Sequence, residues 1–303
     1  MAEFSIIDTY FNRQNKSSVD LGVGDDSAVL TPPIGQQLVI CADTSVAGRH
    51  FPLNTHPHSI GWKSVAVNLS DLAAMGAKPH SILLALSLPQ IDHAWLKDFS
   101  QGLYDCCDQF GVSLIGGDTT QSPHLTLSVT ALGWVDIGQA IPRSGAKLGD
   151  LICVSGTVGD AAFALQHLGH PLQKRLDYPT PRCQLGAALK GLAHSMIDVS
   201  DGLAQDLGHI LKASQVGAKL QLENLPISPA LHALNDEQKW QYALAGGDDY
   251  ELCFTISPQN YEKLLQKQLD ISISMIGTIQ QQHGLTFEKD GTKTSLCSRY
   301  GCI

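Results

Sequence analysis

The sequence has few charged residues and no cluster of positive charge. Asp, Glu, Lys and Arg make up 16% of the 303 residues, and 20 Lys and Arg against 29 Asp and Glu give a formal net charge of −9. A general nucleic-acid binder shows a basic face or stripe, whereas Lys and Arg are scattered here, with Lys174-Arg175 as the one adjacent pair. The composition therefore argues against nucleic-acid binding, although an acidic protein can still bind phosphates through metal ions.

Signals for export, membranes and paired thiols are also missing. Residues 1–5 lack the basic start and apolar run of a signal peptide. The longest apolar run, Ile82–Leu88, is interrupted by Ser87 and is too short to cross a bilayer. None of the eight Cys residues forms a Cys-x-x-Cys pair, which disfavours a zinc or redox site. We therefore expect a cytoplasmic protein with reduced thiols and no membrane partner.

Two common nucleotide-binding motifs are absent. There is no Gly-Lys-Ser/Thr sequence of the P-loop kind. The Gly22-x-Gly24 sequence continues with Asp25-Asp26 and does not complete the dinucleotide fingerprint. Any nucleotide site must therefore use another arrangement.

What is present is an alternation of β-like runs and helical patterns, with 43% apolar residues. The expected strands are 37–42, 80–88, 112–115, 124–135, 150–154, 218–222, 251–256 and 271–279, and the expected helices are 59–75, 92–110, 159–168, 182–193, 203–213 and 260–268. This mixture predicts an α/β (or α+β) fold without a short repeat. A Gly- and Pro-containing linker at 137–149 is expected to separate an N-terminal domain (1–136) from a C-terminal α/β domain (150–303).

Six short acidic strings contain ten of the 29 acidic residues and no Lys or Arg. They place acids after apolar strands and among glycines and hydroxyls, where the backbone can approach a ligand closely, whereas a solvated face would mix both signs of charge. Each string alone also fits a turn or, at 198–201, a cap of the following helix. The complete set favours a function. The strings are 22–28, 42–44, 68–71, 116–120, 197–202 and 246–251.

Helical geometry sharpens the interpretation of one string. If 59–75 is a helix that ends at Gly76, then Ser64, Asn68 and Asp71 share one polar stripe beside an apolar one. Asp71 would then be held on a rigid element. The alternative is that this stripe simply faces solvent.

The chemistry that the strings indicate is oxygen-only ligation. Carboxylates with hydroxyls and carbonyls, without paired Cys or His, suit hard cations such as Mg²⁺. Converging carboxylates without a metal would repel one another. With several Mg²⁺ ions they would instead hold a polyphosphate.

The order and content of these strings resemble the thiamine-monophosphate kinase family, within the superfamily of aminoimidazole ribonucleotide synthetase and selenophosphate synthetase. The resemblance covers nearly the whole chain, and its most specific parts are Val67–Ala77 and Gly246–Leu252. It implies a fold resembling aminoimidazole ribonucleotide synthetase, with two α/β domains and ATP and several Mg²⁺ ions in the cleft between them. It also implies a homodimer formed through the N-terminal ATP- and metal-binding domain. The other matching segments are 22–28, 43, 50–51, 116–120, 143–146 and 197–203.

The resemblance implies roles for individual residues. The metal ligands would be Asp26, Asp43, Asp71, Asp118, Asp198 and Asp201, and the nucleotide contacts would be Gly117, Asp118, Arg143 and Ser200. His50 and Asp248 would contact thiamine monophosphate, and Tyr300 is the candidate for the C-terminal aromatic residue that the family places against the thiamine.

The sequence departs from the family pattern in two places besides the C-terminus. Cys41-Ala42 replaces the hydroxyl residues that usually precede the strand-end aspartate, and Asp248 stands where the family often has Glu. Two residues also have simpler interpretations. Taken alone, His50 is an isolated surface or core histidine and Arg143 a solvated charge, although an Arg offers a planar fork for phosphate oxygens.

The implied reaction is ATP-dependent phosphorylation of thiamine monophosphate to thiamine diphosphate by direct in-line γ-phosphoryl transfer. No general base is expected, because a phosphate monoester with a second pKa of about 6 is largely deprotonated at neutral pH. Metal ions and Arg143 would supply positioning and charge stabilisation. Two alternatives stay open: a superfamily enzyme that uses ATP to activate an amide, carbamoyl or selenide group, and a non-enzymatic nucleotide or metal sensor.

Overall fold

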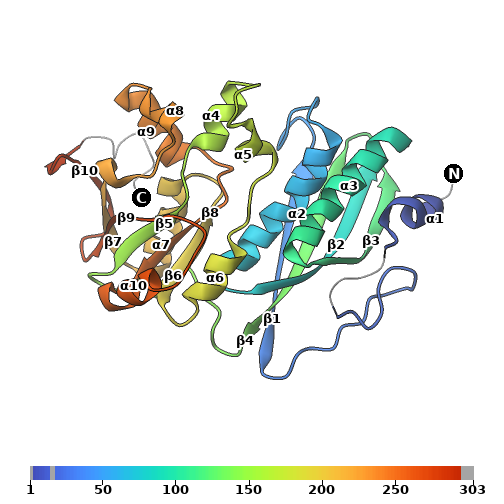
Figure 1. The fold of residues 1–303 in the computed structure, drawn as a ribbon, viewed down its shortest axis with the longest axis horizontal. Coiled ribbons are helices and arrows are strands. Elements are labelled where there is room, and N and C mark those ends of the chain that lie inside the picture. The colour runs from blue at the N-terminus through green and yellow to red at the C-terminus, as the bar shows by residue number, and fades with distance from the viewer. Residues whose placement is uncertain (1–2, 14–17, 295–303) are drawn as a thin grey trace. The chain divides into compact units, whose positions relative to one another are not determined.

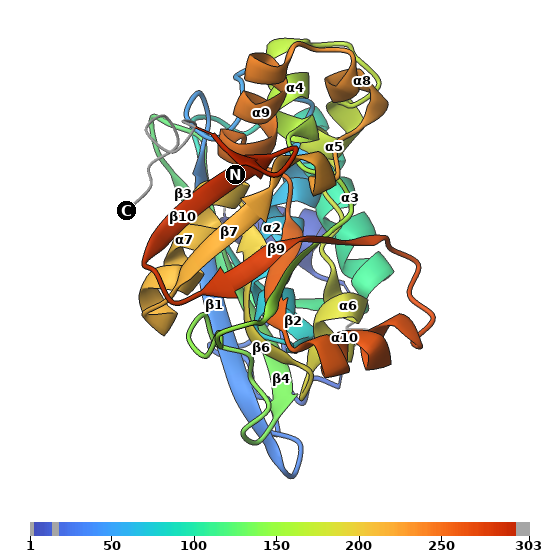
Figure 2. The same cartoon turned by 90° about the vertical axis from the view of Figure 1, so that its left-hand side faces the viewer.

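In a computed structural model, which describes residues 3–13 and 18–294, the chain forms two units, each with its own β-sheet. The first unit comprises Met1–Leu72 and Ala77–Gly138, and the second comprises Ala73–Gly76 and Gln139–Ile303. Figures 1 and 2 show both sheets with their helices. None of the helices within the described ranges is long and apolar enough to span a bilayer.

The first unit is built on a four-stranded sheet in the order β1-β4-β2-β3. β4 pairs antiparallel with both β1 and β2, and β2 pairs parallel with β3. Two long helices, α2 and α3, cover one face of this sheet (Figure 1). The elements are α1 (Glu3–Ile6), the π-helix η1 (Ile7–Phe11), β1 (Gln36–Val46), α2 (Pro57–Ala74), β2 (Lys78–Leu88), α3 (His93–Phe110), β3 (Ser113–Gln121) and β4 (Thr126–Asp136).

Side chains along these strands alternate between two faces of the sheet. Leu84 on β2 and Val129 on β4 are buried, whereas Leu83 and Leu132 on the same strands are only half-buried. Ile40 on β1 pairs with Leu132 and is 57% exposed. One face of the sheet therefore packs in the core and the other is left uncovered.

The two covering helices approach each other through a pair of glycines. A Cβ on Gly61 of α2 would collide with the backbone of Phe99 and Leu103 on α3. A Cβ on Gly102 of α3 would collide with the backbone of His58 on α2. Only residues without a side chain allow the two backbones to come so close at this crossing.

Local capping fixes where α3 begins and ends. The Oδ1 atom of the N-cap Asp92 accepts the backbone N–H groups of Ala94 (2.9 Å) and Trp95 (3.1 Å). The helix ends at Gly111, which adopts the left-handed conformation of a C-cap. The Asp92 cap therefore has a structural role alone.

The second unit is built on a seven-stranded sheet in the order β11-β10-β7-β9-β5-β8-β6. Every residue of β8 is buried, as expected for a strand covered on both faces. The strands are β5 (Leu151–Ser155), β6 (Ala193–Val199), β7 (Gly217–Gln221), β8 (Glu251–Ile256), β9 (Ile273–Gln280), β10 (Gly284–Lys289) and β11 (Thr292–Lys293). The helices are α4 (Asp160–Gln166), α5 (Gln173–Asp177), α6 (Cys183–Leu189), α7 (Leu203–Ser214), α8 (Pro229–His232), α9 (Asp236–Ala245), α10 (Pro258–Leu265) and the 3₁₀ helix η2 (Leu222–Asn224).

The mixed α/β architecture predicted from the sequence is confirmed, but two acids lie elsewhere than expected. Asp43 and Asp118 were expected after the ends of strands, and they lie inside β1 and β3; Asp198, before which no strand was expected, lies inside β6. β1 and β3 continue through these residues because their backbones are still paired with the neighbouring strands. Asp43 pairs with Val129 on β4, and Asp118 pairs with Ala85 on β2. The sequence pattern also missed β6, β10, β11 and the short helices α1, η1, α5, α8, η2 and α9.

Candidate functional site

The backbone of Asp43 and the helix that carries Asp71 meet at Asn68. Asn68 lies on α2 and is fully buried; its Oδ1 accepts the backbone N–H of Asp43 (3.1 Å), and its Nδ2 donates to the carbonyl of Ser64 (3.0 Å). Ser64 is buried as well. The predicted polar stripe of α2 therefore exists, but its interpretation as a solvent-facing stripe is wrong because two of its three members are inside the unit.

Cys41 lies beside the carboxylates of both Asp71 and Asp43. Its Sγ is 3.3 Å from the carbonyl oxygen of Asn68. Burial, and then the negative charges of Asp71 and Asp43, raise the pKa of the Cys41 thiol far above its ordinary value. The thiol therefore stays protonated at neutral pH, and Cys41 is not expected to act as a thiolate ligand.

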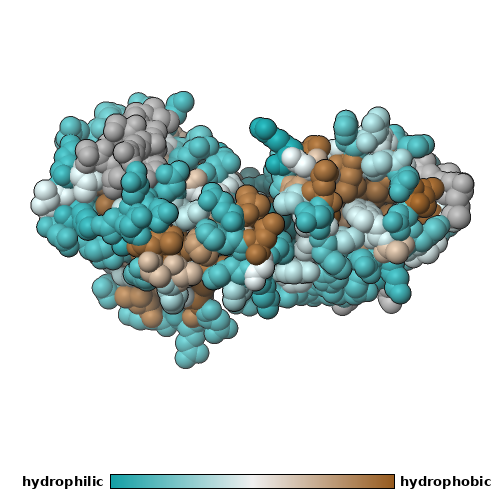
Figure 3. Space-filling view, turned by 90° about the horizontal axis from the view of Figure 1, so that it is seen from above, coloured by the Kyte–Doolittle hydropathy of each residue, from teal (hydrophilic) through white to brown (hydrophobic). Residues whose placement is uncertain are grey.

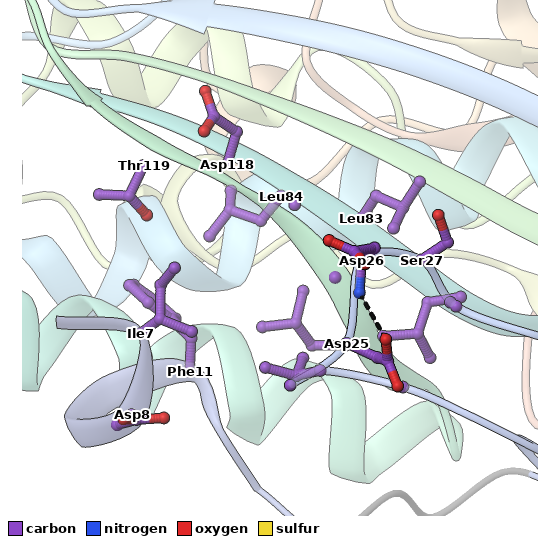
Figure 4. A pocket seen from close by; sticks show the side chains of 18 of the residues that line it. Ile7, Asp8, Phe11, Asp25, Asp26, Ser27, Leu83, Leu84, Asp118 and Thr119 are labelled. Atoms are coloured by element: carbon purple, nitrogen blue, oxygen red, sulfur yellow. Dashed lines mark hydrogen bonds between the residues drawn. The ribbon is translucent and has the colours of Figure 1, made fainter. Parts of the chain in front are cut away.

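A cavity of about 1040 Å³ in the first unit contains three of the predicted site residues. Asp26, Gly117 and Asp118 line it, and Figure 4 shows Asp26 and Asp118 with the neighbouring wall. The Oδ1 of Asp25 accepts the backbone N–H of Asp26 (2.9 Å), the dashed bond in Figure 4. Asp25 forms an isolated bridge with Val23 and Asp26 lies in a bend, so the chain changes direction here, and both acids line the cavity.

The helix η1 contributes to this cavity, which the sequence pattern did not predict. Ile7, Asp8 and Phe11 form part of the wall, together with apolar residues such as Leu83 and Leu84. A five-residue helix is too short to show a helical period in the sequence. The cavity thus combines apolar surface with carboxylates, which suits a ligand that has a ring system and a cation-bridged anion.

His50 lies in a tight turn directly after β1. The backbone N–H groups of Arg49 and His50 both donate to the carbonyl of Val46 (3.1 and 2.9 Å). The Nδ1 of His50 accepts the backbone N–H of Val46 (3.0 Å). Because a neutral imidazole accepts with one nitrogen and donates with the other, the Nε2 atom carries the proton. The exposed ring can therefore donate a hydrogen bond to an anionic ligand.

In the second unit, Asp198, Ser200 and Asp201 lie at the junction of β6 and α7. Asp198 is 4% exposed, Ser200 is half-buried and Asp201 is exposed. The helix α7 follows Gly202 at its N-cap without a side-chain cap from this string. The N-cap position is therefore occupied by a residue without a side chain, and neither Asp198 nor Asp201 stands at it.

The backbone of this junction is bound instead by Asp206, which the sequence analysis missed. Burial raises the pKa of Asp206 to about 7; the N–H of Asp201 opposes this shift, and the charges of Asp198 and Asp201 add to it. An Asp in the first turn of a helix is common because it interacts favourably with the helix dipole. Its sequence position alone therefore gave no signal.

The string 246–251 contains two residues in the left-handed conformation. Asp248 has φ +70° and Tyr250 has φ +51°, and such strained residues often mark functional sites. The hydroxyl of Tyr250 donates to Oδ1 of Asp248 (2.9 Å), and the backbone N–H of Asp248 donates to the carbonyl of Ser200 (2.9 Å). Asp248 is therefore held in one orientation beside the Ser200 segment.

Glu251 anchors this string in the core. It is fully buried, and its carboxylate accepts hydrogen bonds from Arg175 Nη2 (2.9 Å), Arg182 Nε (2.7 Å) and Ser155 Oγ (2.6 Å). A buried carboxylate with two guanidinium partners is already compensated. Glu251 is thus a structural member of the acidic string, and its partners lie too far away in the sequence to be recognised from the motif.

Asp249→Asn is expected to flatten the dependence of stability on pH. Asp249 is 2% exposed and accepts the N–H of Gly159 (2.6 Å), and burial raises its pKa from 3.8 to about 8. Between these values the folded protein binds more protons than the unfolded chain. The free energy of unfolding should therefore fall as pH rises from 4 to 8, by up to about 1.4 kcal/mol per pH unit.

Urea denaturation at pH 5, 6, 7 and 8 measures this effect. The stability of Asp249→Asn relative to the wild type should increase steadily with pH, because the amide does not ionise. The exposed Asp270→Asn is the control and should follow the wild-type curve. Parallel curves for Asp249→Asn and the wild type would show that Asp249 is ionised in the folded protein throughout this range.

Arg143 is exposed in the loop that precedes β5. The Oγ of Ser214 accepts the N–H groups of Gly145 and Ala146 (both 3.1 Å) and donates to the carbonyl of Arg143 (3.4 Å). The backbone of this loop is thus fixed while the guanidinium faces solvent. Tyr300 lies outside the described residues.

The candidate metal ligands in both units are carboxylates. Across 3–13 and 18–294, no group of three or more His, Cys, Asp and Glu side chains is placed to hold a metal ion. The acids instead occur two at a time. Asp43 and Asp71 lie beside Cys41. Asp26 and Asp118 lie in the cavity wall. Mg²⁺ usually takes one or two carboxylates, and waters and substrate phosphates complete its shell. The residues present therefore fit Mg²⁺ in donor type and number.

Comparison with known protein families gives two matches that together cover most of the chain. Residues 24–135 match the model of the AIR synthase related protein, N-terminal domain. Residues 162–289 match the model of the AIR synthase related protein, C-terminal domain. The two matches fall on the two sheets described above.

Individual proteins are similar over the full length. A thiamine-monophosphate kinase of Escherichia coli (strain K12) is 46% identical, over 97% of this chain and 95% of its own. The crystal structure of thiamine-monophosphate kinase from Stenotrophomonas maltophilia K279a is 46% identical, covers 97% of this chain and 98% of that chain, and has a TM-score of 0.86. AaThiL complexed with AMPPCP and TMP is 27% identical, covers 96% and 93%, and has a TM-score of 0.76.

Proposed function

The chain belongs to the thiamine-monophosphate kinase family of AIR synthase related proteins, and on this basis we propose that it transfers the γ-phosphoryl group of ATP directly to thiamine monophosphate. Family membership makes it a kinase, a phosphotransferase whose acceptor is a phosphate group, in thiamine biosynthesis. The observation that carries the proposal is the relative AaThiL, in which a nucleotide analogue and TMP are bound to the same fold. The products would be thiamine diphosphate and ADP.

The proposal assigns a role to each predicted residue. The cavity lined by Asp26, Gly117 and Asp118 supports nucleotide and metal binding, because its apolar wall suits a base and its acids suit a cation-bridged phosphate. The metal ligands are Asp26, Asp43, Asp71, Asp118, Asp198 and Asp201; the nucleotide contacts are Gly117, Asp118, Arg143 and Ser200; the acceptor contacts are His50, Asp248 and Tyr300.

The proposed mechanism is in-line transfer without a general base. Several Mg²⁺ ions, when bound, would supply charge neutralisation between the two phosphates. The chain itself binds and orients: the exposed guanidinium of Arg143 offers a planar fork to phosphate oxygens, and the Nε2–H of His50 donates to an acceptor phosphate. No residue needs to remove a proton, because the second pKa of the acceptor phosphate is about 6.

The assembly and location of the enzyme are part of the same proposal. We infer a cytoplasmic homodimer formed through the N-terminal domain, with 1–136 and 150–303 as the two domains and 137–149 as their linker. The uncovered face of the four-stranded sheet supports a second copy of this chain as the partner, since it exposes Leu38 and Ile40. Apolar side chains that reach the surface are visible in Figure 3. Exposed apolar residues on a sheet face favour burial against another protein surface.

Removal of divalent metal is expected to abolish the reaction. In a coupled assay of ADP release with ATP and thiamine monophosphate, excess EDTA should reduce the rate to background, and added Mg²⁺ should restore it. Ca²⁺ should support nucleotide binding better than turnover, because it accepts looser coordination geometry. An undiminished rate in excess EDTA would contradict the metal-assisted mechanism.

A further inference from the structure

The segment Ser200–Gly202 is bound on one side by a single carboxylate oxygen. The Oδ2 of Asp206 accepts the backbone N–H groups of Ser200 (3.0 Å), Asp201 (3.1 Å) and Gly202 (3.1 Å). Asp206 is 2% exposed and lies in the first turn of α7. Three successive N–H groups can converge on one atom only if the backbone curves around it, so Asp206 sets the curvature of this segment.

The other side of the segment is bound by the acidic string 246–251. The carbonyl of Ser200 accepts the N–H of Asp248 (2.9 Å), and the carbonyl of Val199 accepts the N–H of Tyr250 (2.8 Å). The backbone is therefore fixed from both sides. The side chain of Asp201 is left exposed, where its Oδ2 accepts a hydrogen bond from Nε2 of Gln205 (3.2 Å).

The burial of Asp206 is costly in a way that simple helix capping does not require. Asp201, a further acid, is one of the residues whose N–H it accepts, and Asp198 precedes Asp201 by three residues. A Ser, Thr or Asn at the N-cap would satisfy N–H groups of α7 without burying a carboxyl group. The arrangement is better explained if the shape of the segment, rather than the start of the helix, is what the carboxylate maintains.

We propose that Asp206 is a positioning residue that shapes Ser200–Gly202 so that Asp198, Ser200 and Asp201 present their oxygens to the metal–nucleotide complex. This rests on the proposed function, which gives those three residues their ligands. Its contribution passes through the backbone, because the three groups of the segment that its Oδ2 binds are N–H groups.

Two variants of Asp206 and one control variant, at the N-cap of another helix, test the proposal. Asp206→Ala removes the acceptor, Asp206→Asn keeps one acceptor oxygen of similar reach, and Asp92→Ala removes the structural cap of α3 in the first unit. The readouts are the dissociation constant of Mg²⁺–AMPPCP by calorimetry, the Mg²⁺ concentration for half-maximal rate, the KM for thiamine monophosphate and the melting temperature.

Asp206→Ala is expected to weaken Mg²⁺–AMPPCP binding and raise the Mg²⁺ midpoint by about tenfold or more, because small displacements of positioned groups are costly. The KM for thiamine monophosphate should change less than these two constants, because His50, another proposed acceptor contact, belongs to the first unit. Asp206→Asn should restore most of the loss, and Asp92→Ala should lower the melting temperature without changing either constant. If Asp206→Ala does not fold, as judged by circular dichroism, Asp206→Ser replaces it, since a hydroxyl cannot reach all three N–H groups.

The opposite results would overturn the proposal. Unchanged Mg²⁺–AMPPCP binding in the folded Ala or Ser variant would leave Asp206 with a structural role only, and equal impairment in Asp206→Asn would show that the charge itself acts. Binding of Mg²⁺–AMPPCP without turnover of thiamine monophosphate would reject the proposed function while the binding data still decide on Asp206. A wild-type protein that does not bind Mg²⁺–AMPPCP would reject both.

Discussion

The Asp71→Asn variant is expected to lose at least about a hundredfold in ADP formation from ATP and thiamine monophosphate, since even residues behind a metal ligand are worth ten- to a hundredfold. Asp71 lies at the end of the buried polar stripe of α2, and its carboxylate shares the surroundings of Cys41 with Asp43. The amide has the same shape but offers one neutral oxygen to a cation. The loss should therefore be in metal-dependent steps.

The stability of this variant separates a ligand from a structural residue. Without Mg²⁺, the melting temperature of Asp71→Asn should equal or exceed that of the wild type, because one of two neighbouring negative charges is removed. With Mg²⁺, the wild type should gain stability and the variant should gain less. Asp98→Asn, an exposed change on α3, is the control and should match the wild type in both assays. Near-wild-type turnover in Asp71→Asn would remove Asp71 from the metal site.

Thiamine monophosphate is expected to support ADP release and free thiamine to support essentially none. Free thiamine brings a hydroxyl of high pKa and no anion for metals, Arg143 or His50 to bind. The proposed mechanism uses no general base, and proton removal is what an alcohol acceptor needs. The difference should therefore appear as a loss of turnover, and raising the thiamine concentration should not restore it.

A side-by-side assay with thiamine, thiamine monophosphate and formylglycinamidine ribonucleotide separates the competing functions. Turnover with thiamine would contradict a mechanism that depends on an acceptor phosphate. Turnover with the ribonucleotide instead would place the chain with superfamily enzymes that activate an amide. No ADP release with any of the three, combined with tight Mg²⁺–nucleotide binding, would favour a sensor.

Elements with a strong local pattern could be predicted from the sequence, and elements that depend on distant pairing could not. The strand 251–256 was predicted with the bounds that β8 has, because it is a continuous run of buried residues. Its neighbour β6 was missed, and residue 193 was assigned to a helix. The backbone of β6 is held by β8, more than fifty residues later in the chain, and no local pattern reports such a pairing.

The acidic strings were informative as a set, but their members could not be sorted by role. Asp248 and Asp249 are adjacent and chemically identical, yet the first is half-buried with a strained backbone and the second is buried against Gly159. Glu251 is held by two arginines from α5 and the segment before α6. Burial and distant partners decide which acid is available to a ligand, and neither is visible in a motif.

The glycine pair at the crossing of α2 and α3 limits how the sequence can change. Gly61 and Gly102 carry no chemistry and lie outside the cavity wall, yet even alanine would force the two helices apart. Such a shift would move α2, and with it Asn68 and Asp71, relative to β1. A mutational scan scored by growth would therefore rank these two positions with the carboxylates. Intolerance of substitution at these two glycines reflects the spacing between two helix backbones. Intolerance therefore identifies a catalytic residue only when the contacts of the side chain are considered as well.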